Sequence, residues 1–249
     1  MADLIFENPR LVAIYDAFDG QRRDLDHYLA LAKELRAKSV LDVGCGTGCF
    51  AHRLAQEGFK VFAVDPARSS IEAAKRKANA NQVQWIVGTA SDLPAMSVDL
   101  AVMTGNVAQV FVTDHAWEEA LTATRRALAP IGHLVFEARD PAQKAWMNWT
   151  RERTYERINV PGLGFVEGWC EVTNVENDLV SFKWTYAFDS DGKVLTSDST
   201  LRFQERDAIE LSLKKTGFAV NEVRDAPDRP GKEFVFIASL DDTRYTILL

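Results

Sequence analysis

Leu41-Asp42-Val43-Gly44-Cys45-Gly46-Thr47-Gly48 decides the fold class of this chain. The stretch closes a short apolar run, Ser39–Val43, and a segment with apolar residues three or four apart, Cys49–Glu57, follows at once. These patterns predict a buried strand and then a helix. Glycine adopts positive φ and lets a ligand approach the backbone, while the first turn of a helix leaves N–H groups free to donate. The stretch therefore predicts a ligand site, and a turn that serves packing alone is the alternative.

The same alternation of apolar runs and helical segments continues from Lys38 to Leu134. It predicts an α/β fold with a doubly wound, Rossmann-like parallel sheet. The expected strands are Ser39–Val43, Lys60–Val64, Val83–Val87, Val98–Met103 and Gly132–Ala138. The expected helices are Cys49–Glu57, Ser69–Asn79 and Asp114–Leu128, and Ala129-Pro130-Ile131-Gly132 should stop the last of them.

The flanking segments predict a helical cap and an insertion. Two helices, Pro9–Phe18 and Arg22–Leu35, should pack over the mouth of the sheet, and the alternating pattern of Thr154–Phe203 predicts an antiparallel insertion. Turn signals within it are Pro161-Gly162, Glu176-Asn177-Asp178 and Asp189-Ser190-Asp191-Gly192. The chain should return to the sheet through a helix, Arg206–Lys215, that ends at Gly217, and strands Phe218–Val223 and Glu233–Ser239. We therefore expect a cap (1–37), a core (38–141), an insertion that is a candidate substrate lid (142–205), the end of the core (206–240) and a tail without pattern (241–249).

Composition narrows the function classes. The chain has 249 residues, 47% hydrophobic and 26% charged, with a net charge of −7 and a pI near 5.2. An acidic protein is a poor match for nucleic acid. No run of eighteen apolar residues occurs and the start, MADLIFENPR, lacks the pattern of a signal peptide, which predicts a cytoplasmic protein with no membrane partner. The three cysteines are too few and wrongly spaced for a disulfide framework or a zinc site, so no metal is expected.

Two ligand classes fit a glycine turn of this kind. A dinucleotide site needs Gly-x-Gly-x-x-Gly, but position 49 is Cys, and no Tyr-x-x-x-Lys pair supports a nicotinamide-dependent oxidoreductase. The spacing Asp-x-Gly-x-Gly-x-Gly instead resembles motif I of the class I S-adenosylmethionine-dependent methyltransferases, and the resemblance extends over Ser39 to Val135. It implies S-adenosylmethionine as cofactor, S-adenosylhomocysteine as product, and a last strand antiparallel to its neighbours. It also implies that Gly44, Cys45, Gly46 and Gly48 line the methionine and ribose region and that Asp42 reaches the cofactor amine.

Three further segments match the family in order. Asp65 follows Gly48 by 17 residues, where an acid accepts hydrogen bonds from ribose hydroxyls, and Pro66 follows it. Ala90, Ser91 and Asp92 resemble the adenine loop, although Asp92 could equally cap a turn. Thr104, Gly105 and Asn106 resemble the segment at the methionine end of the cofactor. Amino-methylating DNA enzymes of this fold have Pro-Pro after the Asn or Asp, whereas Val107 and Ala108 follow here.

The sequence motifs say less about the methyl acceptor than about the cofactor. The N-terminal residues around Tyr15 resemble a subgroup with sugar amine N-methyltransferases and glycine N-methyltransferase, in which an early Tyr approaches the cofactor; an aromatic edge buried by a helix is the alternative. The insertion is rich in aromatic residues, which could wall an apolar pocket, form its own core or contact a second copy in a homodimer. Glu137 is the predicted general base among the nearby candidates Arg139, Asp140 and His115.

The sequence therefore predicts an enzyme that moves a methyl group in line from S-adenosylmethionine to the amine or hydroxyl of a small-molecule acceptor. A protein or peptide methyltransferase is the runner-up, and a cofactor-binding regulator without turnover is the alternative from another class.

Overall fold

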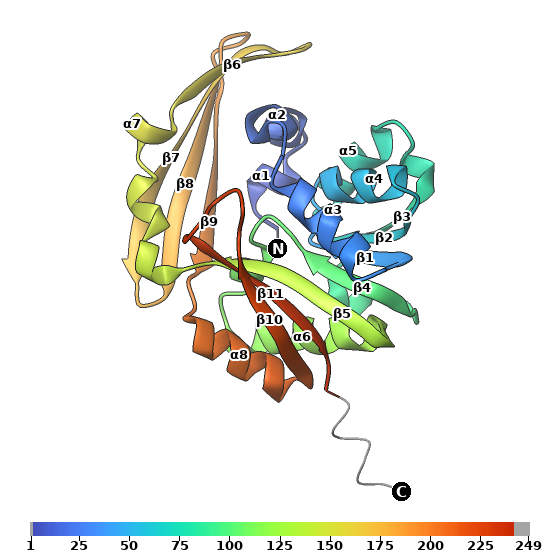
Figure 1. Ribbon diagram of the computed structural model, residues 1–249. Helices are drawn as coiled ribbons and strands as arrows, with labels where there is room; N and C mark the ends of the chain where they lie inside the picture. The colour runs from blue at the N-terminus through green and yellow to red at the C-terminus, as the bar shows by residue number, and fades with distance from the viewer. Residues whose placement is uncertain (1, 242–249) are drawn as a thin grey trace, which may run out of the picture.

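The computed structural model describes residues 2–241 and divides their strands between two sheets (Figure 1). The main sheet has seven strands in the order β10-β11-β5-β4-β1-β2-β3. These are β1 (Ser39–Val43), β2 (Lys60–Asp65), β3 (Val83–Val87), β4 (Val98–Met103), β5 (Leu128–Arg139), β10 (Phe218–Asp225) and β11 (Glu233–Leu240). The insertion sheet has the order β6-β7-β8-β9, with β6 (Glu156–Val160), β7 (Gly164–Glu176), β8 (Leu179–Phe188) and β9 (Val194–Arg202).

The topology of the main sheet places a crevice beside β1. Strands β3, β2, β1, β4 and β5 pair in parallel, and the chain order reverses between β1 and β4. Ligands bind outside the carboxyl ends of parallel strands at such a switch point. Strand β11 pairs antiparallel with both β5 and β10. This is the antiparallel last strand that the resemblance implied, and the doubly wound α/β prediction is confirmed.

Helices cover both faces of the main sheet. Neighbouring residues of β1 point to opposite faces, as the period of two requires. Val40 joins a core cluster with residues of α3 (Leu25–Glu34) and α4 (Cys49–Gln56), whereas Leu41 joins a cluster with residues of α6 (Asp114–Ala127) and α8 (Arg206–Lys215). The apolar runs of the central strands are continuous because both faces are buried.

The insertion sheet stands against the N-terminal helices. Helices α1 (Leu4–Glu7) and α2 (Pro9–Asp19) lie between this sheet and α5 (Arg68–Arg76) (Figure 1). Ile5, Leu11 and Ile14 share a core cluster with Val166, Tyr186 and Phe188 of the insertion. The remaining helices are short: α7 (Arg151–Thr154), η1 (Ala80–Gln82), η2 (Ala90–Asp92), η3 (Val107–Val110), η4 (Pro141–Gln143) and η5 (Ala145–Asn148).

The predicted elements differ from the structure mainly at their ends. The expected helix Arg22–Leu35 begins only at Leu25, because Arg22 has a positive φ of 42°. Strand β5 begins at Leu128, four residues before the expected start. Val98 pairs with Leu128 and Leu100 with His133, so residues 129–132 bulge outward and leave Ile131 84% exposed. The three turns of the insertion fall where the turn signals predicted them.

Helix α1 and the short helices were not predicted, because four-residue helices carry too little periodicity. Of the tail, only Asp241 lies within the described residues. No helix in residues 2–241 combines the length and the apolar character that crossing a bilayer requires.

Candidate functional site

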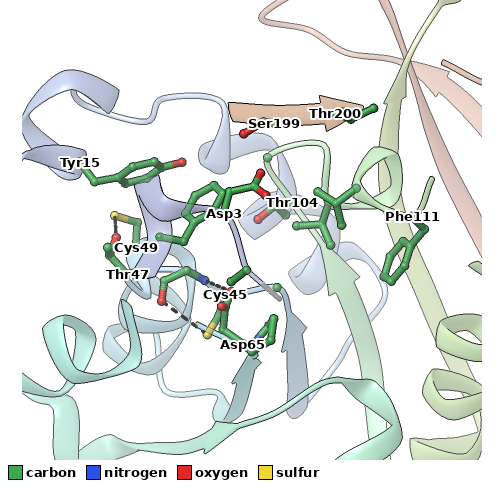
Figure 2. A pocket seen from close by; sticks show the side chains of 18 of the residues that line it. Asp3, Tyr15, Cys45, Thr47, Cys49, Asp65, Thr104, Phe111, Ser199 and Thr200 are labelled. Carbon is green, nitrogen blue, oxygen red and sulfur yellow. Dashed lines mark hydrogen bonds between the residues drawn. The ribbon is translucent and has the colours of Figure 1, made fainter. Parts of the chain in front are cut away.

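A cavity of about 740 Å³ opens at the carboxyl ends of β1, β2 and β4 (Figure 2). Three parts of the chain line it. The strand ends contribute Asp42, Gly44, Cys45, Gly46, Thr47, Cys49, Phe50, Asp65, Pro66, Thr89, Thr104 and Gly105. We name this the cofactor side. The acceptor side consists of Ala2, Asp3 and Phe6 beside α1, the segment after β4 (Val107, Val110, Phe111 and Val112), and Thr173, Ser181, Phe182, Asp198, Ser199 and Thr200 of the insertion. Tyr15, Arg22 and Leu25 close the cavity from the N-terminal helices.

The three glycines of the turn have positive φ but different surroundings. A Cβ on Gly46 would meet no atom within 4 Å, and Gly46 faces the cavity. A Cβ on Gly48 would lie 2.4 Å from Cη2 of Trp85, and Gly48 does not line the cavity. A Cβ on Gly44 would lie 2.7 Å from the side chain of Val107. Gly46 therefore leaves ligand space, whereas Gly48 lets the turn pack against the core.

Asp65 organises the turn from the end of β2. Its Oδ2 accepts a hydrogen bond from the N–H of Gly46 at 2.8 Å, and its Oδ1 accepts one from the N–H of Ala67 at 2.8 Å. The side chain is buried, which raises the pKa of Asp65 above its ordinary value. Each carboxylate oxygen can accept a further hydrogen bond. Asp65 can therefore hold the turn and still accept from a ligand.

Asp42 lies beneath the turn and is 1% exposed. Within the described part of the chain its Oδ2 has no hydrogen-bond partner. Burial and the nearby Asp65 carboxylate raise the pKa of Asp42 to about 7. A buried acceptor without a partner is costly unless a ligand supplies a donor. A cationic or N–H-bearing ligand group beside Asp42 would meet that need.

Asn106 and Glu137 support the cavity from behind. Asn106, at a positive φ of 62°, donates its N–H to Oε1 of Glu137 at 2.7 Å and its Nδ2 to Glu233 at 3.4 Å. Neither Asn106 nor Glu137 lines the cavity, whereas Thr104 and Gly105 do. Burial raises the pKa of Glu137 to about 7. The geometry thus gives Glu137 a role in holding the loop, and its role as a general base stays a prediction.

The acid of the loop after β3, Asp92, is exposed and bonds within its own loop. Asp92 accepts hydrogen bonds from the N–H and the hydroxyl of Thr89, at 2.8 and 2.9 Å, and so caps η2. Ser91 donates to Glu119 at 3.0 Å. Thr89 lines the cavity, but Ala90, Ser91 and Asp92 do not. The turn-capping interpretation of Asp92 fits this geometry better than a contact with an adenine.

Tyr15 faces the cavity from α2 and packs against Phe6, with 5.4 Å between the ring centres (Figure 2). Burial raises the pKa of Tyr15 well above its ordinary value, so its hydroxyl remains a donor. The next residue, Asp16, anchors α2. Its carboxylate accepts a hydrogen bond from the hydroxyl of Thr47 at 2.5 Å and forms an ion pair with Lys77 at 2.5 Å. The N-terminal helix is thereby tied directly to the glycine turn.

Arg22 and Asp3 reach the cavity without any signal in the sequence. Arg22 is held by Asp24 and Asp19, each at 2.8 Å, and its Nη2 would lie 3.5 Å from a Cβ on Gly105. It places a positive charge at the cofactor side. Asp3 belongs to no periodic or motif-like segment, and Arg22 stands at the start of an expected helix without any motif, so only the tertiary structure could have indicated them as site residues.

The aromatic residues of the insertion mostly pack with one another. Trp149 lies against Phe182 with ring centres 4.8 Å apart, and Trp146 lies 4.6 Å from Phe203. Trp184 stacks on Tyr186 at 5.8 Å. Of these side chains only Phe182 lines the large cavity. The insertion therefore uses its aromatic residues chiefly for its own core and for its contact with the N-terminal helices.

The other sequence candidates lie away from the cavity. His115 is exposed on α6, and neither Arg139 nor Asp140 lines the cavity. Arg139 instead contacts Glu233 at 3.6 Å. In residues 2–241 no three His, Cys, Asp or Glu side chains are grouped to hold a metal ion.

A family model matches the first part of the main sheet, from β1 to the start of β5. Residues 40–132 match the family model described as a methyltransferase domain. The cypemycin N-terminal methyltransferase of a Streptomyces species is 33% identical over 115 residues, which are 45% of this chain and 46% of that protein. The chain spans about half or less of the length of the curated relatives it matches.

Solved structures share the fold over almost the whole chain. An S-adenosylmethionine-dependent methyltransferase from Clostridium acetobutylicum superposes with a TM-score of 0.73 at 18% identity, covering 94% of this chain and 98% of that one. CalS10 from Micromonospora echinaspora, an amino pentose methyltransferase solved with S-adenosylmethionine bound, gives a TM-score of 0.66 at 17% identity, covering 88% and 92%. Together with the glycine turn and the antiparallel β11, these matches identify residues 40–132 as a methyltransferase domain and show that the chain has the fold of solved S-adenosylmethionine-dependent methyltransferases.

Proposed function

We propose that this chain is an enzyme that transfers the methyl group of S-adenosylmethionine to a small-molecule acceptor. One observation carries the proposal: a single cavity joins the glycine turn and Asp65 on its cofactor side to the insertion on its acceptor side. The match of residues 40–132 to a methyltransferase domain and the similar structure of CalS10 with bound S-adenosylmethionine support the choice of cofactor. When bound, this cofactor supplies a sulfonium methyl group that can be displaced in line.

The residues of the cofactor side fit the group chemically. The open space at Gly46 admits the cofactor close to the backbone, and Asp65 offers oxygens to the ribose hydroxyls. The cofactor's amino group would supply the donor that Oδ2 of Asp42 lacks. Arg22 would pair with its carboxylate, since it is the one arginine among the described residues that line the cavity. The amino group and the carboxylate of the cofactor's methionine part thus each have a partner of opposite charge.

The walls favour a small molecule over a protein substrate. The acceptor side is lined by residues from α1, from the segment after β4 and from β7, β8 and β9, so a small acceptor can lie within the cavity and displace water from it. The second candidate is the amino terminus of a peptide. It is favoured by one observation, the similarity to a protein named as an N-terminal methyltransferase. A cofactor-binding regulator without turnover is the third.

Two measurements test the proposal. Calorimetry should give tighter binding of S-adenosylmethionine and S-adenosylhomocysteine than of NAD. Incubation with methyl-deuterated S-adenosylmethionine and a metabolite extract, beside a parallel incubation with a peptide library, should label a metabolite. Labelled peptides with unlabelled metabolites would favour the second candidate. Cofactor binding without label in either pool would favour the regulator.

A further inference from the structure

We propose that Asp3 binds the acceptor and that the accepting atom is an amine nitrogen. The inference deepens the proposed function and rests on it. Asp3 precedes α1, lines the acceptor side, and turns its carboxylate toward Thr104 near the carboxyl end of β4 (Figure 2). This position lies between the cofactor side and β9, where an acceptor must sit to face the cofactor.

The carboxylate of Asp3 is not used by the fold. Asp3 occupies the N-cap position of α1, where an Asp side chain normally accepts a backbone N–H, yet it makes no such bond. Only its carbonyl oxygen accepts, from Phe6 and Glu7 at 3.0 and 3.2 Å. Throughout residues 2–241 no donor or cation pairs with its side chain. An acid in a cavity wall without a structural partner is available for a ligand.

The other charged groups of the cavity are either paired within the fold or, like Asp42, lie on the cofactor side. Asp198 lies 3.6 Å from Lys183, and Asp65 accepts two backbone N–H groups. Arg22 pairs with Asp24 and Asp19. On the acceptor side Asp3 is therefore the carboxylate left to meet a positive charge.

The backbone holds Asp3 in place. The N–H of Ile5 donates to the buried Oγ of Ser197 at 2.9 Å, which ties α1 to β9. On the opposite side Ser70 of α5 donates to the carbonyl of Phe6 at 2.7 Å. The side chain of Ile5 is 4% exposed. With anchors on both sides, α1 presents Asp3 as part of a rigid wall, which is what an acceptor-aligning group requires.

An amine suits this carboxylate better than a hydroxyl does. A carboxylate forms an ion pair with an ammonium and accepts an N–H from the free amine. After the ammonium has lost one proton to water, the nitrogen lone pair forms the bond to the methyl carbon. The carbon–sulfur bond breaks and its electron pair stays on sulfur, so positive charge moves from sulfur to nitrogen. Asp3 lies where that charge develops, and fixed charges there lower the barrier. A hydroxyl acceptor would also need a base, and in the described part of the acceptor side the candidates are the carboxylates of Asp3 and Asp198, with no His, Lys or Glu.

The experiment determines which atom of the product carries the labelled methyl group. Wild-type protein, Asp3→Asn, Asp3→Glu and Glu7→Gln are each incubated with methyl-deuterated S-adenosylmethionine and the same metabolite extract. Fragmentation mass spectrometry then assigns the label to nitrogen, oxygen, carbon or sulfur. Glu7→Gln is the matched control, because it removes an acid from the same helix that does not line the cavity. Calorimetry with S-adenosylhomocysteine is run on all four proteins.

We expect an N-methylated product, a loss of roughly tenfold to a hundredfold in its rate of formation for Asp3→Asn, and a smaller loss for Asp3→Glu. S-adenosylhomocysteine affinity should stay within about threefold for every variant, and Glu7→Gln should match the wild type. An O-, C- or S-methylated product, or an Asp3→Asn rate within twofold of the wild type, would overturn the inference while leaving the proposed function intact. No cofactor binding, or no labelled product at all, would overturn the proposed function itself.

Discussion

Gly46 and Gly48 stand two residues apart in one turn, yet replacing each with Ala should damage different properties. Gly46 has a φ of 53° and Gly48 a φ of 78°, so alanine is strained at both. A methyl group on Gly46 would enter the open cavity, whereas one on Gly48 would meet the Trp85 ring. Gly46→Ala should therefore impair ligand binding, and Gly48→Ala should impair folding stability.

The expected magnitudes separate the two variants. Left-handed backbone costs a residue with a Cβ about 1–2 kcal/mol. That is the whole stability cost expected for Gly46→Ala. In Gly48→Ala the Cβ would approach Cη2 of Trp85 at 2.4 Å and Cβ of Ala74 at 3.1 Å. Overpacking of this kind costs a further 1–3 kcal/mol or so. A domain with an unfolding free energy of about 5–15 kcal/mol should survive both changes.

Urea unfolding and calorimetry with S-adenosylhomocysteine measure the two effects separately. Gly48→Ala should lower the unfolding midpoint more than Gly46→Ala, and Gly46→Ala should weaken the ligand by at least about tenfold, or 1.4 kcal/mol. Trp85→Leu provides the control, since removing the ring should shrink the stability cost of Gly48→Ala in the double variant. Equal midpoints for the two alanine variants, or unchanged affinity in Gly46→Ala, would refute this division of roles.

Three further outcomes are expected. Asp65→Asn should weaken S-adenosylhomocysteine binding by about 1.5–3 kcal/mol in calorimetry, because an amide replaces the buried carboxylate; an unchanged dissociation constant would remove Asp65 from the site. Phe182→Leu should lower kcat/KM for the acceptor about tenfold at unchanged cofactor affinity, and the reverse pattern would contradict the acceptor side as we define it. Burial raises the pKa of Glu137 from 4.5 to about 7, so its contribution to stability is fully present below pH 4.5 and is lost progressively as the pH rises from 4.5 through 7. Denaturation from pH 4.5 to 8 should show Glu137→Gln gaining up to about 3 kcal/mol relative to the wild type, and parallel curves would contradict a buried, protonated Glu137.

The sequence predicted the main sheet well because burial on both faces leaves a local signature. Strands β1, β3 and β4 have the residues expected from their apolar runs, and α8 begins and ends as expected. The start of β5 was placed too late because Pro130 and Gly132 look like a helix stop, whereas in the structure they form a bulge opposite Asp99. The local pattern thus indicates which strands and helices exist. It does not show where one strand bulges relative to its neighbour in the sheet.

The predicted site residues also divide into those that local spacing places correctly and those whose orientation depends on the folded structure. Those predicted from motif spacing at the strand ends, such as Gly46, Asp65 and Thr104, do line the cavity. Glu137 and Asp92 have suitable chemistry in suitable segments, but Glu137 turns toward the N–H of Asn106 and Asp92 toward Thr89. A carboxylate near a loop accepts the nearest free N–H, and sequence alone does not show whether that donor belongs to the loop or to a ligand.

The sequence predicted the insertion as a candidate substrate lid, but the individual residues of the acceptor side could not be predicted, for a physical reason. Its walls join segments far apart in the chain: Ile5 of α1 is bonded to Ser197 of β9, 192 residues away. The cofactor side is built within consecutive strand–loop–helix units, so its residues follow one another at regular spacings. An acceptor pocket made by docking an N-terminal helix onto an insertion has no such spacing. Asp3 therefore cannot be identified as a site residue until the structure shows α1 packed between α5 and β9. Variation in the N-terminal helix or in the insertion would change the acceptor without disturbing the cofactor turn.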